Sequence, residues 1–331
     1  MLTRRALALG ALALTCVRAQ PAPAQRAPRA CAVTAEPEAV ARVTRDVTWL
    51  ADDARAGRLS GTPGYDAAAE YVQRELVALR VEPAGTQGFL QPFTFADAPA
   101  RAEVRTANVL ARVPGTAPDG LTVLVGAHLD HVGRGDRASR SGHREIHNGA
   151  DDNASGAAAL LELARRLQAR PAARDVVLAW FGAEEYGLLG SAHLARNPVP
   201  ATRALAAMMN FDMVGRLRDC RVVVEGTETA RGFAGVLARA NAPTGDDVRP
   251  WDHRRLGAWG ASDHESFSSR GTPVLFFFTG LHAEYHTELD DLPTLNLPGI
   301  VAVTSLAERA LREVAALPAP ELRRAIARRR R

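Results

Sequence analysis

Several features are scarce or missing in this chain of 331 residues, and each one narrows what the protein can be. Lysine is absent, so all 41 basic residues are arginines, which is a bias of composition and points to no function. Only 3 cysteines occur, which argues against a metal site built from sulfur ligands. No sequence unit is repeated along the chain, which argues against a repeat architecture.

Long apolar runs are also missing, apart from a short one near the start. Arg4 and Arg5 precede the apolar run Ala6–Val17, and the small residues Ala22–Ala24 follow. This order is typical of a cleaved export signal, and the run is too short for a stable transmembrane helix. We therefore expect residues 1–24 to be a signal peptide. The rest should carry no integral membrane segment and be exported to the periplasm or secreted.

The basic charge is concentrated at one end. The formal net charge is +4, but residues 323–331 contain so many arginines that acids outnumber arginines in the rest of the chain. No arginine stripe interleaved with aromatics occurs elsewhere, so we expect no nucleic-acid surface. Residues 319–331 are interpreted as a basic tail that ends a helix, with contact to an anionic surface as the alternative.

About 47% of the residues are apolar, enough to bury a sizeable core. Residues 25–39 form a Pro/Ala-rich leader, so residues 40–318 are expected to be the folded domain. Periodicity and breaker residues predict alternating helices and strands. The expected helices are Val40–Arg55, Gly64–Arg80, Ala157–Arg170, Arg231–Asn241 and Thr294–Leu317; the expected strands are Glu103–Val113, Leu121–Ala127, Asp175–Phe181, Ala204–Asn210, Arg221–Val224 and Thr272–Thr279.

Acids and histidines follow the buried strands at the point where each one ends. His128 and Asp130 close the strand Leu121–Ala127, and Asp212 follows Ala204–Asn210. Ligands of open α/β sheets bind at the carboxyl ends of the strands. In an extended strand Asp130 would face the same side as His128 and could accept the N–H of its second ring nitrogen. A capped strand end is the alternative.

Two pairs of adjacent acids complete this pattern. Asp151 and Asp152 stand among Gly, Asn, Ala and Ser in the run His147–Gly156, where small neighbours leave a carboxylate open to metal ions. Its alternative is a turn that caps the following helix. Glu184 and Glu185 follow the strand Asp175–Phe181, where one carboxylate can bind metal and the other move protons. The alternative there is a pair of acids that complements a helix dipole.

The strand Thr272–Thr279 leads to His286, so the strand ends and the run around Asp151 together contribute His128, Asp151, Glu184, Glu185, Asp212 and His286. Two histidines and several carboxylates, without a cysteine, favour zinc or another borderline divalent metal. Five ligands are too many for a single tetrahedral zinc that keeps an open position. They suit two metals about 3.5–4 Å apart that share one carboxylate and one water.

These segments together resemble peptidase family M28, the zinc peptidases of the bacterial leucyl-aminopeptidase type. The similarity covers Val40 to Leu317. It rests on the motifs Arg58–Gly64, Asn108–Ala111, His128–Asp130, His147–Gly156, Glu184–Glu185, Asn210–Gly215, Ser262–His264 and Tyr285–Thr287.

The resemblance implies a three-layer α/β/α sandwich around a mixed, largely parallel eight-stranded sheet. It also implies two Zn²⁺ per chain, with Mn²⁺ or Co²⁺ as substitutes, and a cis peptide bond between Asp151 and Asp152. The roles it implies are metal binding by His128 and Asp212 and by Glu185 and His286, a bridging role for Asp151, a general base in Glu184 and support of His128 by Asp130.

The function implied is an exported aminopeptidase that removes the first residue of peptides. Substrate contacts are expected from Trp259, Tyr285, Met213 and Arg216. Trp259, Tyr285 and His264 are the candidates to donate a hydrogen bond to the oxyanion that develops on the substrate carbonyl. A glutaminyl cyclase-like acyltransferase, which would use one zinc, is an alternative. A carboxypeptidase or other amidohydrolase is another, and it would need a cationic clamp, for which Arg216 is the candidate. A non-catalytic binding module should have lost ligands, and none is missing.

Overall fold

A mixed β-sheet forms the centre of the computed structural model of this protein. The structure describes residues 33, 35–97, 100, 102–136, 138–142, 144–242, 249–251 and 262–323. Eight strands follow one another in the order β1-β3-β5-β4-β6-β9-β7-β8, and a ninth, β2, pairs with β3 beside β1. Their bounds are β1 Glu82–Pro83, β2 Leu90–Asp97, β3 Ala102–Val113, β4 Thr122–His128, β5 Asp175–Phe181, β6 Leu205–Phe211, β7 Arg221–Glu225, β8 Arg249–Trp251 and β9 Val274–Phe278.

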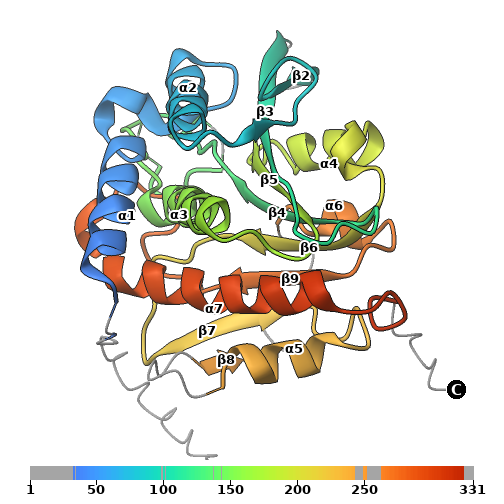
Figure 1. The fold of residues 1–331 in the computed structure, drawn as a ribbon. Helices are drawn as coiled ribbons and strands as arrows, with labels where there is room; N and C mark the ends of the chain where they lie inside the picture. Colours follow the sequence, from blue (N-terminus) through green and yellow to red (C-terminus); the bar gives the residue numbers. More distant parts are fainter. Residues whose placement is uncertain are drawn as a thin grey trace, which may run out of the picture.

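Helices cover both faces of the sheet, which gives the three-layer sandwich that the family resemblance implies (Figure 1). The helices α1, α2, α3, α5 and α7 share a hydrophobic core with one face, and α4 and α6 pack on the other. Their bounds are α1 Pro37–Leu50, α2 Pro63–Ala78, α3 Gly156–Ala169, α4 Leu189–Arg196, α5 Phe233–Ala240, α6 Glu265–Ser268 and α7 Leu297–Ala316, with short helical turns η1 Asp53–Arg58, η2 Ala150–Ser155, η3 Pro200–Thr202 and η4 Leu292–Thr294.

The four central strands are parallel to one another. β4 pairs in parallel with β5 and β6, and β6 pairs in parallel with β9. Their residues are buried on both faces, which explains the nearly continuous apolar runs Val176–Phe181 and Val274–Phe278. Because the strands are parallel, their carboxyl ends meet at one edge of the sheet, and the polar residues that follow them are brought together there.

Several short or half-buried elements were not predicted, among them strands β1, β2 and β8 and helix α4. Strand β2 contains Pro92 and is only partly buried, so it lacks the apolar run of a central strand. Helix α4 has 8 residues and follows a turn, which is too short for a clear helical period. The other expected elements are present with bounds that shift by a few residues.

The ends of the chain and the cysteines lie partly outside the described residues. The signal peptide lies outside the described residues, as does most of the leader and of the basic tail. Cys220 is disulfide-bonded, and neither Cys31 nor Cys16 belongs to the described residues. Within the part of the chain that the structure describes, no helix has the length and apolar character needed to cross a membrane.

Candidate metal centre and active site

Histidines and carboxylates meet at the carboxyl edge of the central strands. Three groups among the described residues have ligand atoms within 4.8 Å of one another. The groups share members, so they form one continuous cluster. They are His128 with Asp152 and Asp212; His131 with Asp152, Glu185 and His286; and His128 with Glu184 and Glu185.

His128 is the last residue of β4 and is almost fully buried. Its Nδ1 lies 3.1 Å from the main-chain carbonyl oxygen of Asp130, so the ring donates through Nδ1. Its Nε2 is then free to face Asp152 Oδ1 at 3.2 Å and Asp212 Oδ1 at 3.3 Å. Burial alone would lower the pKa of His128, but Asp212 and the other carboxylates raise it well above its usual value. The ring thus presents one nitrogen to two acids, as a metal-ligating imidazole does.

The carboxylate of Asp130 has a different partner from the one predicted. Its Oδ1 is 4.0 Å from His128 Nδ1 but accepts a hydrogen bond of 3.1 Å from the backbone N–H of Glu184. The carbonyl of Asp130, and not its carboxylate, therefore orients His128. The carboxylate instead fixes the start of the glutamate pair, and burial raises its pKa to about 7.

His286 follows β9 in the chain and comes from a loop. Its Nδ1 donates to the carbonyl oxygen of Ala138 at 3.0 Å, and its Nε2 lies 3.0 Å from Asp152 Oδ2 and 3.3 Å from Glu185 Oε2. Burial would lower the pKa of His286, but the bonds to these two carboxylates raise it to about 11. As with His128, one nitrogen is held by a carbonyl and the other faces acids.

Asp152, rather than Asp151, is the carboxylate shared by two groups. Asp151 points elsewhere: its Oδ1 accepts from the N–H of Gly215 at 2.6 Å, and its Oδ2 lies 3.2 Å from Nε2 of His282. The expectation for Asp151 therefore does not fit this geometry, because the turn directs successive side chains to opposite sides. The predicted position of the cis peptide was wrong in the same way, since that bond joins Asp152 and Asn153.

The two glutamates after β5 have different surroundings. Glu185 Oε1 lies 2.9 Å from His131 Nδ1, and its Oε2 lies 3.3 Å from His286 Nε2. Burial and the charge of Asp152 would raise the pKa of Glu185, but these two histidines lower it to about 2. Glu184 is partly exposed, and loss of hydration raises its pKa well above the usual value. Neighbours with pKa values moved in opposite directions are suited to different roles.

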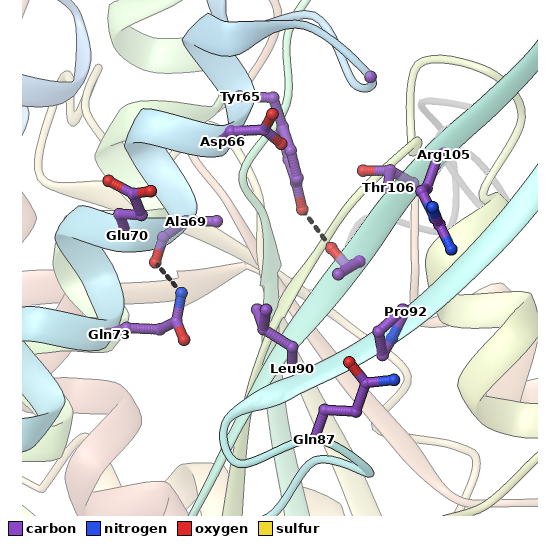
Figure 2. A pocket seen from close by; sticks show the side chains of 12 residues that line it. Tyr65, Asp66, Ala69, Glu70, Gln73, Gln87, Leu90, Pro92, Arg105 and Thr106 are labelled. Carbon is purple, nitrogen blue, oxygen red and sulfur yellow. Dashed lines mark hydrogen bonds between the residues drawn. The ribbon is translucent and has the colours of Figure 1, made fainter.

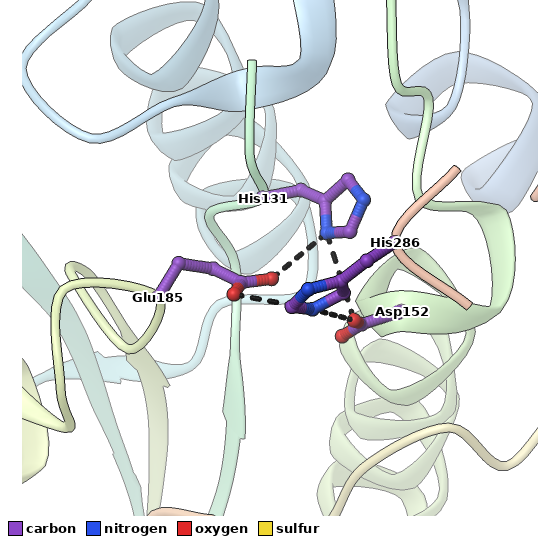
Figure 3. Close-up of side chains that lie close together, drawn as sticks. All are labelled: His131, Asp152, Glu185 and His286. Carbon is purple, nitrogen blue, oxygen red and sulfur yellow. Dashed lines mark hydrogen bonds and ion pairs between the residues drawn. The ribbon is translucent and has the colours of Figure 1, made fainter. Parts of the chain in front are cut away.

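His131 was missed by the sequence analysis. It follows Asp130 directly and is fully buried, and its Nδ1 also lies 3.7 Å from Asp152 Oδ2. Figure 3 shows its ring pointing to the same space as Glu185, Asp152 and His286. The signal was available as a second histidine in the run His128–His131, but the motif quoted for the family resemblance ends at Asp130.

Two of the expected substrate contacts lie beside the cluster. Met213 belongs to a small apolar cluster with Val223, Phe276 and Phe278, against which Tyr285 packs. The ring of Tyr285 stacks on His286 with centroids 3.9 Å apart. The partly exposed ring of Tyr285 thus lies beside the histidine–carboxylate cluster, whereas Met213 and its apolar neighbours are buried.

The other two residues expected to contact substrate are Arg216 and Trp259. Arg216 is 5% exposed, and its guanidinium lies 3.3 Å from Asp290 and 3.5 Å from Glu284. It is therefore engaged with acids and not free to clamp a carboxylate, which corrects its expected role. Trp259 lies outside the described residues. His264, the further oxyanion candidate, is buried and stacks on Phe276 with centroids 4.4 Å apart.

A separate pocket of about 570 Å³ lies between α2 and the strands β2 and β3 (Figure 2). Asp66 and Glu70 line it from the helix and Arg105 from the strand, and the hydroxyl of Tyr65 donates to the carbonyl oxygen of Ala107 on its wall. None of its lining residues belongs to the histidine–carboxylate cluster. The pocket is therefore not part of the candidate metal centre.

Comparison with known proteins gives relatives among peptidases. The chain is 31% identical over 289 residues to leupeptin-inactivating enzyme 1 of Streptomyces exfoliatus, which covers 84% of this chain and 58% of that protein. It is 36% identical over 136 residues to an aminopeptidase of Pseudomonas aeruginosa, which covers 41% of this chain and 23% of that protein. The chain thus spans little more than half of the first relative and about a quarter of the second.

Solved structures share the fold at low sequence identity. A leucine aminopeptidase precursor from Bacteroides thetaiotaomicron has a TM-score of 0.67 at 18% identity, covering 85% of this chain and 99% of that one. A glutaminyl cyclase from Fimbriiglobus ruber has a TM-score of 0.70 at 20% identity, covering 89% and 99%. The fold is therefore common to peptidases and cyclases and does not choose between them. Residues 108–311, more than half of the chain, match the model of peptidase family M28, and the chain belongs to this family.

Proposed function

We propose that residues 40–318 form a metal-dependent aminopeptidase domain that hydrolyses the N-terminal peptide bond of peptides. The observation that carries this proposal is the pair of histidine–carboxylate groups that share Asp152. Family membership supports the reaction class, and the relatives named as aminopeptidases support the choice of the peptide's amino end.

The donor set fits two divalent ions. His128, Asp152 and Asp212 would hold one, and Asp152, Glu185 and His286 would hold the other. Imidazole nitrogens and carboxylate oxygens without thiolates suit zinc, with manganese or cobalt as substitutes. Such ions, when bound, lower the pKa of a water toward neutrality and polarise a substrate carbonyl.

Glu184 would move the protons. Its carboxylate stands beside His128 and Glu185 but, unlike Glu185, forms no ion pair with a histidine among the described residues. The backbone N–H of Glu184 donates to the carboxylate of Asp130, which fixes the position from which the Glu184 side chain extends. It would accept the proton of the attacking water at a carboxylate oxygen and then deliver it to the amine that leaves.

The relatives named as aminopeptidases favour an amino-terminal substrate. Two bound divalent ions would offset the charge of the four carboxylates at the cluster, so the charge of these acids does not select the peptide end. The ring of Tyr285, which packs against Met213 and its neighbours, would contact the first side chain. A carboxypeptidase would need a free cation, and Arg216 is already paired.

A glutaminyl cyclase is the second candidate, favoured by the fold shared with such enzymes. The two functions separate in a direct assay. The metal-reconstituted protein should release the first residue from aminoacyl peptides, leave N-blocked peptides intact and not convert N-terminal glutamine to its cyclic form. Cyclisation without hydrolysis would overturn the proposal.

The glutamate pair gives a matched test of mechanism. Glu184→Gln should lower kcat by about 10²–10⁴-fold with metal content and KM little changed, because it removes only the base. Glu185→Ala should lose metal and activity together. Kinetics and elemental analysis on the same preparations check both. A Glu184→Gln protein that keeps most of its kcat would show that the base lies elsewhere.

We also propose that the protein is exported. The signal-like residues 1–24 support this, and so does the disulfide at Cys220, since such bonds persist in oxidising compartments. Expression with the full N-terminus, followed by fractionation and N-terminal sequencing, tests it. Retention of an uncleaved chain in the cytoplasm would contradict it.

A further inference from the structure

The two candidate metal positions differ in the number of side chains around them. Among the described residues, the position of His128 has three, whereas the position of His286 is surrounded by four because His131 joins it. Figure 3 shows the four side chains converging from separate segments of the chain. His131 is fully buried, so its ring faces this space and not solvent.

The distances between these side chains are close to those around one tetrahedral ion, with His131 facing Oε1 of Glu185 and His286 facing its Oε2. Ligands at about 2.0–2.1 Å from zinc stand about 3.3 Å from one another in a tetrahedron. His131 Nδ1 is 2.9 Å from Glu185 Oε1 and 3.7 Å from Asp152 Oδ2. His286 Nε2 is 3.0 Å from Asp152 Oδ2 and 3.3 Å from Glu185 Oε2. These separations scatter on both sides of the ideal edge.

The backbone around His131 leaves room for its ring beside the segment that carries Asp152. A Cβ atom at Gly149 would lie 2.4 Å from Cδ2 of His131, so only glycine leaves room for the imidazole. The N–H of His131 donates to the carbonyl of Arg58 at 3.3 Å. The ring is thus seated by the same segment that carries Asp152.

A simpler role is a hydrogen bond from His131 to Glu185. In that role Nδ1 of His131 would carry a proton. This proton would be donated to Glu185 and would also lie near Asp152. In both roles Nε2, which is buried, has no hydrogen-bond partner among the residues that the structure describes, so hydrogen bonding at Nε2 does not decide between them. Nδ1 of His131 lies near the carboxylates of both Asp152 and Glu185, and its ring lies beside the imidazole of His286. This arrangement favours coordination of a metal ion.

We propose that His131 is a fourth protein ligand of the ion held by Asp152, Glu185 and His286. The two positions are then unequal: this one is closed and tight, and the position of His128 keeps the open coordination place that catalysis needs. The ions should bind in sequence, with the closed position filled first. The inference rests on the proposed metal centre, but its test does not use peptidase activity.

The test is a titration of the metal-free full-length protein with Co²⁺, followed by chelator competition and by the visible absorption of the bound ion. Loss of a partner that only supports a ligand costs about 10–100-fold in affinity. His131→Ala should weaken the tight binding phase by more than about 100-fold and change the absorption band of the first ion. His131→Asn should be as weak as His131→Ala, because an amide replaces the hydrogen bond to Glu185 but is a poor ligand.

His147→Ala is the matched control. His147 is also fully buried nearby in the chain, but its nitrogens contact Ser139 and the carbonyl of Glu145 and, within the described part of the chain, no carboxylate. It should keep both binding phases, and circular dichroism of the metal-free variants should match that of the wild type. Recovery of affinity in His131→Asn, or an unchanged tight phase in His131→Ala, would overturn the proposal. If the wild type binds no Co²⁺, the metal centre itself fails, which is a separate result.

Discussion

Asp151 and Asp152 are neighbours of the same chemical type, yet their carboxylates have different partners. Asp152 faces His128 and His286, whereas Asp151 accepts the N–H of Gly215 and faces His282. No property of the sequence separates two adjacent aspartates, because the direction of each side chain is set by the turn between them. The sequence could therefore predict that an acid in this run is central, but not which one.

These neighbours give a matched pair of variants. Asp152→Asn should weaken binding at both metal positions by more than about 100-fold, because it removes a ligand and not merely a supporting partner. Asp151→Asn should bind metal with far less loss, since its Oδ1 acceptor is kept. Isothermal titration with Zn²⁺ on both proteins checks this. Equal losses, or a larger loss in Asp151→Asn, would restore Asp151 as the shared ligand.

The other residue-scale differences have a similar cause. The sequence predicted His128, Glu184, Glu185, Asp212 and His286, and the structure brings all five together. The parallel strands β4, β5 and β6 end at or shortly before the first four, whereas His286 comes from a loop well beyond β9 and is implied by a motif of the family resemblance. His131 also lies in a loop, and none of the motifs quoted for the resemblance contains it.

At the scale of elements, one buried arginine joins three segments that surround the cluster. Arg58 has no exposed surface and donates to the carbonyls of Leu50 at 2.8 Å, Leu129 at 3.0 Å, Asn148 at 2.6 Å and Gly149 at 3.0 Å. It thus connects the end of α1, the end of β4 and the segment before η2. Burial lowers its pKa to about 10, so it stays charged at neutral pH.

Replacing this arginine should be costly. Arg58→Met leaves four buried carbonyls without a donor and should lower the free energy of unfolding by about 3–5 kcal/mol. Arg58→Lys should recover only part of this, because an ammonium cannot reproduce the planar fork. Urea unfolding of the metal-free proteins measures both. Arg55, whose guanidinium lies over the ring of Trp49 at 4.0 Å, is the control, and an Arg58→Met loss no larger than that of Arg55→Met would contradict the role.

A second element-scale feature is the charged contact between α1 and α3. Arg42 donates to both oxygens of the buried Glu162 at 2.9 Å, and Arg166 donates to Oε1 at 3.0 Å. Burial alone would raise the pKa of Glu162, but these two arginines lower it below its usual value. A carboxylate with a lowered folded-state pKa stabilises the fold above its unfolded-state pKa of about 4.3, and this contribution is lost as the pH falls through the folded-state value.

The lowered pKa of Glu162 predicts how stability depends on pH. Glu162→Gln should be less stable than the wild type at pH 7 by about 1–3 kcal/mol, and the difference should shrink as the pH falls below about 4. Denaturant unfolding across the acid range checks it. Glu313→Gln is the control, because its pair with Arg239 is exposed, with side chains 38% and 54% accessible. A difference that stays constant with pH would contradict the prediction.

Across the whole molecule, the layers were predictable because apolar runs and helical periods recur along the chain. The runs that form β4, β5, β6 and β9 are buried on both faces, and such runs identify the centre of a sheet. The strands at the two edges of the sheet were less predictable. Strand β2 is half-buried and the described part of β8 has 3 residues, so neither carries a strong pattern.

The same assembly makes metal binding a property of the folded chain. The ligand atoms come from the segments after β4, β5, β6 and β9 and from η2, which lie apart in the sequence and meet only in the folded sheet. An ion that binds the folded state alone stabilises it by about 2.7 kcal/mol per site when its free concentration is 100 times Kd. For a domain of this size that corresponds to roughly 5 °C in Tm.

Metal removal should therefore lower the stability of the wild type by a measurable amount. Thermal unfolding of the zinc-loaded protein should show a Tm at least roughly 5 °C above that of the chelated protein, and re-addition of Zn²⁺ should restore it. In Asp152→Asn the same chelation should change Tm little, because the shared ligand is already missing. This variant separates binding at the proposed centre from binding elsewhere, since only the former depends on Asp152. A wild type whose Tm is the same with and without chelator would contradict a metal centre that links these five segments.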